Sequence, residues 1–160
     1  MRRLLKSQTI SVVWFIYWVA FHGFGCGHDG MTPWIRLGND ACDECHMIIS
    51  ELKDAAVIRI SNGMEYRFDD IGCFLNFLKR FNGSVESAFV YDYFRGDWIR
   101  PEEAVFIQSA EFRTPMGYGI IATTARDRVE ALKRSGQAIR VETYKGILSL
   151  ELRSNDGGKT

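Results

Sequence analysis

The sequence predicts an α+β fold made of two strand–strand–helix–strand units in tandem. In each half of the chain, two β-rich segments precede an amphipathic segment with helical spacing, and a third β-rich segment follows it. A capping residue precedes each amphipathic segment and a glycine follows it, as is typical of helix ends. Each unit would form a small sheet with one helix on a face, which is an α+β arrangement. The two halves share no obvious residue identity, so the repeat is one of topology.

The first unit is indicated by a hairpin signal and a capped helix. Asn62-Gly63 favours a tight turn between two strands. Asp69 and Asp70 can accept hydrogen bonds from the free N–H groups of a helix start, and we expect both to be capping, solvated residues. The expected elements are strands over 54–60 and 65–68, a helix over 71–80 ended by Asn82-Gly83, a strand over 87–93, and a turn at 95–97.

The second unit repeats this order. Thr123 or Thr124 is expected to cap its helix, and Gly136 to end it. The expected elements are strands over 104–108 and 117–122, a helix over about 125–135 and a strand over 137–143.

The start of the chain is typical of an export signal. Basic residues at 2, 3 and 6 precede an apolar run over 10–21, which is shorter than the roughly 20 residues of a spanning helix. Small residues then precede Cys26, as at a bacterial lipoprotein processing site, so Cys26 is predicted to carry a lipid. The alternative is an uncleaved N-terminal anchor helix.

These observations predict the organisation of the chain. We expect a signal or lipoprotein segment over 1–25, a flexible tether over 26–41, a first unit over 42–95, a second unit over 96–152 and a disordered tail over 153–160. The formal net charge is 0, and residues 1–25 contribute +3, so the remainder carries −3. A mildly acidic body argues against a nucleic-acid partner.

The stretch from Cys42 to Met47 gathers candidate metal ligands. Two thiols (Cys42 and Cys45), the imidazole of His46 and the thioether of Met47 fall within six residues. Soft and borderline ligands of this kind suit Cu(I). A further thioether, Met116, lies in a turn bracketed by proline and glycine, and we expect it to complete the same site.

Other interpretations of this stretch remain open. Structural zinc would need a second pair of Cys or His ligands, which the sequence does not offer as a paired motif. A thioredoxin-like redox site would need a helix directly after the motif, and none is indicated. Met47 could instead continue an apolar strand into the core, Met116 could pack there too, and His46 could be a solvated neighbour.

The remaining candidates have structural interpretations. Cys73 falls in the first turn of the predicted helix among apolar neighbours, and core packing is favoured over reactivity. Asp92 lies between two tyrosines on a predicted strand, where we expect it to anchor the turn at Arg95 rather than to carry chemistry.

Four motifs, in this order along the chain, resemble those of the NosL family, the copper lipoproteins that assist nitrous oxide reductase. They are Asp40-x-Cys-x-x-Cys-His-Met47, Phe68-Asp-Asp-Ile-Gly-Cys73, Val90-Tyr-Asp-Tyr93 with Trp98-Ile99, and Thr114-Pro-Met-Gly-Tyr-Gly119. The resemblance covers residues 40–143. It implies two ββαβ units, a fold shared with organomercurial lyase, and one Cu(I) held by sulfur, with Cys42, Cys45, Met47 and Met116 as candidate ligands.

The function expected from this resemblance is that of a membrane-anchored, extracytoplasmic Cu(I) chaperone for nitrous oxide reductase, without enzymatic activity. Two rivals remain. One is an enzyme like organomercurial lyase, in which Cys42, Cys45 or Cys73 would act with Asp70. The other is a generic metal-resistance or redox lipoprotein.

Overall fold

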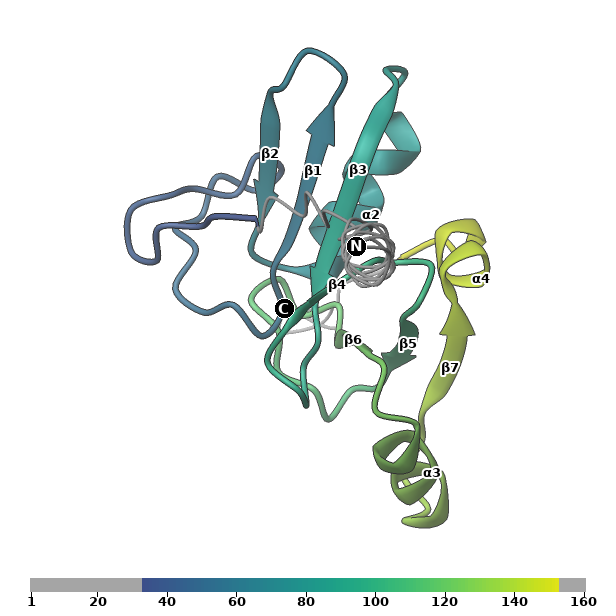
Figure 1. Ribbon diagram of the computed structural model, residues 1–160. Helices are drawn as coiled ribbons and strands as arrows, with labels where there is room; N and C mark the ends of the chain where they lie inside the picture. The colour runs from purple at the N-terminus through teal and green to yellow at the C-terminus, as the bar shows by residue number, and fades with distance from the viewer. Residues whose placement is uncertain (1–32, 153–160) are drawn as a thin grey trace, which may run out of the picture. The chain divides into compact units, whose positions relative to one another are not determined.

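The computed structural model describes residues 33–152 and confirms the α+β class (Figure 1). Two small antiparallel sheets are each formed by a strand–strand–helix–strand sequence. The predicted signal segment, residues 26–32 of the predicted tether, and the predicted tail lie outside the described residues. No helix within 33–152 is long and apolar enough to cross a membrane.

The first sheet has the strand order β2-β1-β3-β4. The predicted turn is confirmed, because the side-chain oxygen of Asn62 accepts the Met64 N–H at 2.9 Å and Gly63 has a φ of +82°. The fourth strand lies beyond residue 95, so this sheet extends past the boundary that we predicted for the first unit. Its strands are β1 (Ala56–Ile60), β2 (Glu65–Phe68), β3 (Val85–Tyr91) and β4 (Trp98–Ile99).

Helix α2 (Ile71–Arg80) has the predicted bounds. Its N-cap is Asp70, whose carboxylate accepts the Gly72 N–H at 2.7 Å. The apolar residues of its first half are fully buried against β1 and β2, which fixes the position of the residues in its first turn.

The second sheet has the strand order β6-β5-β7. A short helix after β7 was not predicted. The elements are β5 (Val105–Gln108), β6 (Ile120–Thr123), α3 (Arg126–Arg134), β7 (Arg140–Thr143) and α4 (Tyr144–Ser149).

The predicted cap of α3 was wrong. Its N-cap is Ala125, which makes no side-chain capping bond. The Thr123 and Thr124 hydroxyls donate to the carboxylate of Asp92, each at 2.7 Å, and the Thr123 hydroxyl oxygen also accepts the Ala125 N–H at 2.9 Å. Asp92 also accepts the Arg95 N–H at 3.0 Å, so the predicted anchoring of that turn is confirmed.

One apolar core joins the two sheets, because α2 contacts both β1 and β6. Fully buried side chains from both units meet in it, among them Ile58, Phe74, Phe106, Ile120 and Ile147. A second, smaller cluster under α3 consists of Ile107, Ile121 and Val129.

The segment before β1 folds into a loop that lies beside β2 (Figure 1). Its two arms pair through the bridge between Ala41 and Ile48 and the 2.9 Å bond from the Gly38 N–H to the Ile49 carbonyl. Residues 36–41, which we assigned to the tether, belong to this loop. The bend between the arms contains the cysteine motif.

Candidate metal centre

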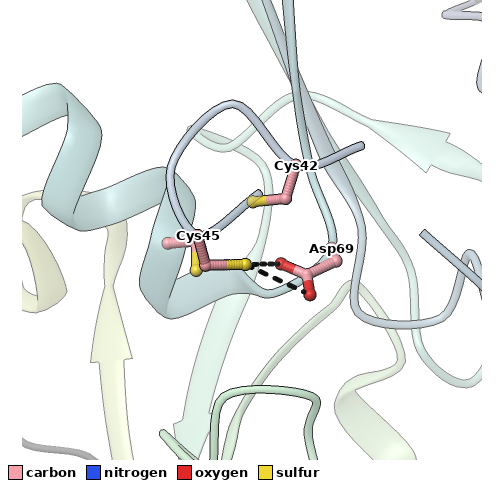
Figure 2. A group of neighbouring side chains, drawn as sticks. Cys42, Cys45 and Asp69 are labelled. Atoms are coloured by element: carbon pink, nitrogen blue, oxygen red, sulfur yellow. Dashed lines mark hydrogen bonds between the residues drawn. The ribbon is translucent and has the colours of Figure 1, made fainter. Parts of the chain in front are cut away.

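Three thiols and one carboxylate converge at the N-terminal end of α2. The ligand atoms of Cys42, Cys45, Asp69 and Cys73 all lie within 4.8 Å of one another. Figure 2 shows the side chains of Cys42, Cys45 and Asp69 pointing toward a common point. Three separate segments supply them, namely the bend, the residue after β2 and the first turn of α2.

The bend holds its two cysteines in a tight turn. The Cys42 N–H donates to the Met47 carbonyl at 2.8 Å, and the His46 N–H donates to the Cys42 carbonyl at 2.9 Å. His46 has a φ of +63°, a left-handed conformation that is uncommon outside glycine. This turn buries Cys42 completely and leaves Cys45 half-buried. No helix follows it, in agreement with the weak case for a thioredoxin-like site.

The two acidic residues between the cysteines fix the turn to the rest of the fold. Asp43 pairs twice with the backbone of Arg67 on β2, donating from its N–H at 2.8 Å and accepting on its carboxylate at 2.6 Å. The Glu44 carboxylate accepts from the guanidinium of Arg80, at the end of α2, at 2.6 Å. The cysteine turn is therefore attached to both β2 and α2.

The thiols of the cluster differ in acidity. A hydrogen bond from the Cys73 thiol lowers the pKa of Cys42 to about 7, although burial acts in the opposite direction. The same contact, together with burial, raises the pKa of Cys73. Burial raises the pKa of Cys45 to about 12. The first negative charge on the thiols therefore belongs to Cys42.

The two neighbouring aspartates have different roles. Asp69 accepts a hydrogen bond from the Cys45 thiol, with Sγ–oxygen distances of 3.4 and 3.6 Å. The carboxylate of Asp70 instead accepts the N–H groups of Gly72 at 2.7 Å and Met116 at 2.9 Å. The carboxylate beside the thiols is therefore Asp69, whereas the enzyme alternative invoked Asp70.

The expected solvation of both aspartates was wrong. Asp69 is 2% exposed and Asp70 is fully buried, because the cysteine turn and the loop around Met116 cover the start of α2. Burial also raises the pKa of Asp70.

The loop with Met116 is attached to the same end of α2. Met116 is half-buried and packs against the core that contains Cys42 and Cys73. Tyr118 in the same loop accepts a hydrogen bond from the Asn76 amide at 2.9 Å. The absence of a side chain at Gly72 is required here, since a Cβ would lie 2.1 Å from the Tyr118 ring.

The other candidate ligands from the sequence lie outside the cluster. Met47 is 44% exposed and belongs to no strand, so the alternative in which it packs in the core was wrong. His46 is also exposed. Cys26 lies outside the described residues. The roles of these residues as ligands or lipid carrier stay predictions.

The sequence favours core packing for Cys73 and a capping role for Asp69, with no part in the site for Asp69. Cys73 is indeed buried, at 1% exposed, but its thiol contacts Cys42. A local signal did exist, because Asp69 and Cys73 are four residues apart across a helix start. Only the tertiary contact with the turn shows that the two residues face Cys42 and Cys45.

Comparison with known proteins supports the fold. No family model and no curated protein matches the sequence. The fold, two ββαβ units in tandem, is that of a solved copper chaperone. That structure is NosL from Shewanella denitrificans, with a TM-score of 0.58 and 16% identity over 68% of this chain and 90% of the other. At this identity the likeness establishes the fold.

Proposed function

We propose that this protein is an exported copper chaperone that carries one Cu(I) ion to the assembly of nitrous oxide reductase. The observation that supports this most directly is the convergence of three thiols within 4.8 Å at the N-terminal end of α2. Thiolates and thioethers are the ligands that Cu(I) prefers. The NosL-like fold and the four family motifs agree with this cargo.

The acidity of the thiols suggests an order of binding. Cys42 is the thiol with the lowest pKa, so it is the first to offer a thiolate. Cys45 and Cys73 would follow with release of their protons, and the Met116 thioether would add a neutral ligand from the second unit. The exposed pair His46 and Met47 would contact copper first as it arrives or last as it leaves.

Transfer would proceed by ligand exchange. Because Cys42 and Cys73 are buried and Cys45 is half-exposed, a partner's sulfur ligand can approach copper from the side of Cys45. Copper would pass between proteins without becoming free, and no covalent bond of a substrate is made or broken. This is the work of a chaperone and not of an enzyme.

The location follows from the predicted export segment. Cleavage before Cys26 and lipidation of its thiol would tether the protein to the periplasmic side of a bacterial membrane. Its partners there would be nitrous oxide reductase or the proteins that assemble it. Membrane fractionation of cells with wild-type Cys26 or Cys26→Ser tests the anchor, because the variant should move to the soluble periplasmic fraction.

The copper site is tested by anaerobic loading of the reduced protein with Cu(I). We expect one copper per chain and an X-ray absorption spectrum with a first shell of sulfur. A chain with Cys42, Cys45 and Cys73 all replaced by serine should hold no copper against a chelator, whereas Cys26→Ser should bind like the wild type. A first shell dominated by nitrogen or oxygen would overturn the proposed site.

Delivery is tested by mixing the loaded protein with nitrous oxide reductase that lacks copper. Copper should appear in the reductase faster than from an equal concentration of Cu(I)–chelator complex. Equal rates would contradict a chaperone role for this partner.

A further inference from the structure

We infer that the four converging side chains form a second kind of site, a tetrahedral one for a divalent ion of the zinc class, with Asp69 as its fourth ligand. The sequence offered no second pair of zinc ligands beside Cys42 and Cys45. The fold supplies one, because Asp69 and Cys73 are brought to the same point from opposite sides of the α2 N-cap. This inference does not depend on the proposed copper function.

The spacing of the ligand atoms fits such an ion. Zinc bonds of about 2.3 Å to sulfur and about 2.0 Å to oxygen place the ligand atoms of a tetrahedron roughly 3.5–3.8 Å apart. Cys45 Sγ and Asp69 Oδ1 are 3.4 Å apart, and all four ligand atoms lie within 4.8 Å of one another. Modest contraction of the cluster around an ion would complete the geometry.

Asp69 is the residue that distinguishes a divalent ion from Cu(I). A carboxylate is a hard ligand that zinc accepts and that Cu(I) does not favour. Asp69 is 2% exposed, and no Lys, Arg or His in residues 33–152 forms an ion pair with it. A buried carboxylate without a cation is costly, and a divalent ion would compensate its charge better than a monovalent ion.

The hydrogen bond between Cys45 and Asp69 occupies the place that the ion would take. The Cys45 thiol directs its proton at the carboxylate. Binding would replace this proton with a cation that joins the same two atoms. The surrounding turn is already fixed by Asp43 and Glu44, so the site needs little reorganisation.

The two kinds of ion would share the three thiols and differ in the fourth ligand. A divalent ion would take the Asp69 carboxylate, and Cu(I) would take the Met116 thioether. Metal discrimination would then depend on two residues from different units of the fold.

The first test uses the full-length, reduced protein and Co(II) as a spectroscopic probe for Zn(II). We expect one Zn(II) per chain, and with Co(II) both a thiolate-to-metal charge-transfer band and the intense visible bands of tetrahedral coordination. Weak octahedral bands without charge transfer would overturn the site, even if some metal bound elsewhere.

The second test compares variants across the two metals. Asp69→Asn should weaken Zn(II) retention by at least about tenfold, the smallest loss caused by removing even an indirect partner of a metal ligand, and should weaken Cu(I) retention less than Zn(II) retention. Met116→Leu should weaken Cu(I) retention more than Zn(II) retention. Asp69→Cys supplies another zinc ligand, so it should restore tetrahedral Co(II) binding, which loss of folding alone cannot explain. Equal Zn(II) retention by Asp69→Asn and wild type would refute the inference.

The two proposals fail separately in these experiments. Tight Zn(II) binding without Cu(I) retention would leave the divalent site standing and remove the copper chaperone. Retention of Cu(I) with no tetrahedral Co(II) spectrum would leave the copper site standing and refute the divalent site.

Discussion

The carboxylate of Asp70 joins Met116 to the helix that bears Cys73. One of its oxygens accepts the Gly72 N–H at 2.7 Å and caps α2, and the other accepts the backbone N–H of Met116 at 2.9 Å. A single buried side chain therefore holds the backbone at the start of α2 and the backbone of Met116 together. The carboxylate thus links the Met116 loop to the start of α2, and completion of the cysteine site by the Met116 thioether stays a prediction from the sequence.

Replacement of Asp70 by alanine should affect both stability and copper binding. The change removes an N-cap, which typically costs about 0.5–2 kcal/mol, and a buried charge-assisted hydrogen bond to Met116 worth about 1.5–3 kcal/mol. We expect the free energy of unfolding, measured by urea denaturation of the metal-free protein, to fall by about 2–4 kcal/mol. Copper retention should fall as well, because the Met116 loop is released.

A matched control for the cap exists in α4. Thr143 caps that helix by accepting the Gly146 N–H at 3.3 Å. Thr143 lies far from the thiols in the sequence, and within residues 33–152 its side chain accepts no hydrogen bond from a second loop. Thr143→Ala should therefore cost about 1 kcal/mol and leave copper retention unchanged. If Asp70→Ala loses no more stability than this control, the bond to Met116 contributes nothing.

Local signals in the sequence were sufficient to predict the bounds of α2 but not to predict the bounds of β6 or the presence of α4. The N-cap at Asp70 defines the start of α2, and the helix ends at Arg80, with Phe81 as its C-cap just before the Asn82-Gly83 signal. Strand β6 instead starts at Ile120 and not at Gly117, because Gly117 and Gly119 have φ values of +68° and +62° that do not fit a strand. Helix α4 is only six residues long and has one buried residue, too little for a periodic pattern.

The candidate site could be predicted only in part, because local patterns in the sequence do not record tertiary contacts. Cys42 and Cys45 are three positions apart in the sequence, and their spacing is itself a metal-binding pattern. Cys73 and Asp69 join them through a tertiary contact between the turn and α2, which no local pattern records. An apolar neighbourhood predicted burial of Cys73 correctly, and burial was mistaken for the whole of its role.

The three methionines within residues 33–152, all on turns and loops, should differ in their effect on Cu(I) binding. Met116→Leu keeps volume and polarity but removes the thioether, so Cu(I) retention should fall by about tenfold, or ~1.4 kcal/mol. Met47→Leu, on the exposed side of the site, should mainly slow copper exchange. Met64→Leu is the control, because Met64 is an exposed residue of the β1–β2 hairpin. Competition with a chromogenic Cu(I) chelator measures all three.

Removal of the Cys73 thiol should raise the pKa of Cys42. In the wild-type metal-free protein, thiolate absorbance in the ultraviolet should show one step near pH 7, since the pKa of Cys42 is lowered to about 7 by the Cys73 thiol. In Cys73→Ala the donor is lost, and this step should move up toward the ordinary cysteine value of about 8.5. Cys45→Ala should leave it in place, because Cys45 assists Cys42 through its backbone N–H. A step that stays near 7 in Cys73→Ala contradicts the assigned hydrogen bond.

Asp54 should make the protein less stable as the pH rises from acid to neutral. This residue precedes β1, is 1% exposed, and has one side-chain oxygen without a hydrogen-bond partner in the part of the chain that the structure describes. Burial raises the pKa of Asp54 to about 7. An unfolded aspartate titrates near pH 3.9, so between about pH 4 and pH 7 the unfolded chain loses this proton while the folded chain keeps it. The contribution of Asp54 to the free energy of unfolding therefore falls across this window and is constant above it.

Asp54→Asn tests this directly, because it removes the charge and keeps the shape. The difference in unfolding free energy between variant and wild type should grow in favour of the variant from about pH 4 to pH 7 and then level off, at about 1–3 kcal/mol, the usual cost of a buried group without a partner. Asp97, an exposed acid in the turn before β4, provides the matched control, and Asp97→Asn is measured over the same pH range. A flat difference for Asp54→Asn would mean that the carboxyl has a partner or a path to water that lowers its pKa, and it would remove the stability cost assigned to this side chain.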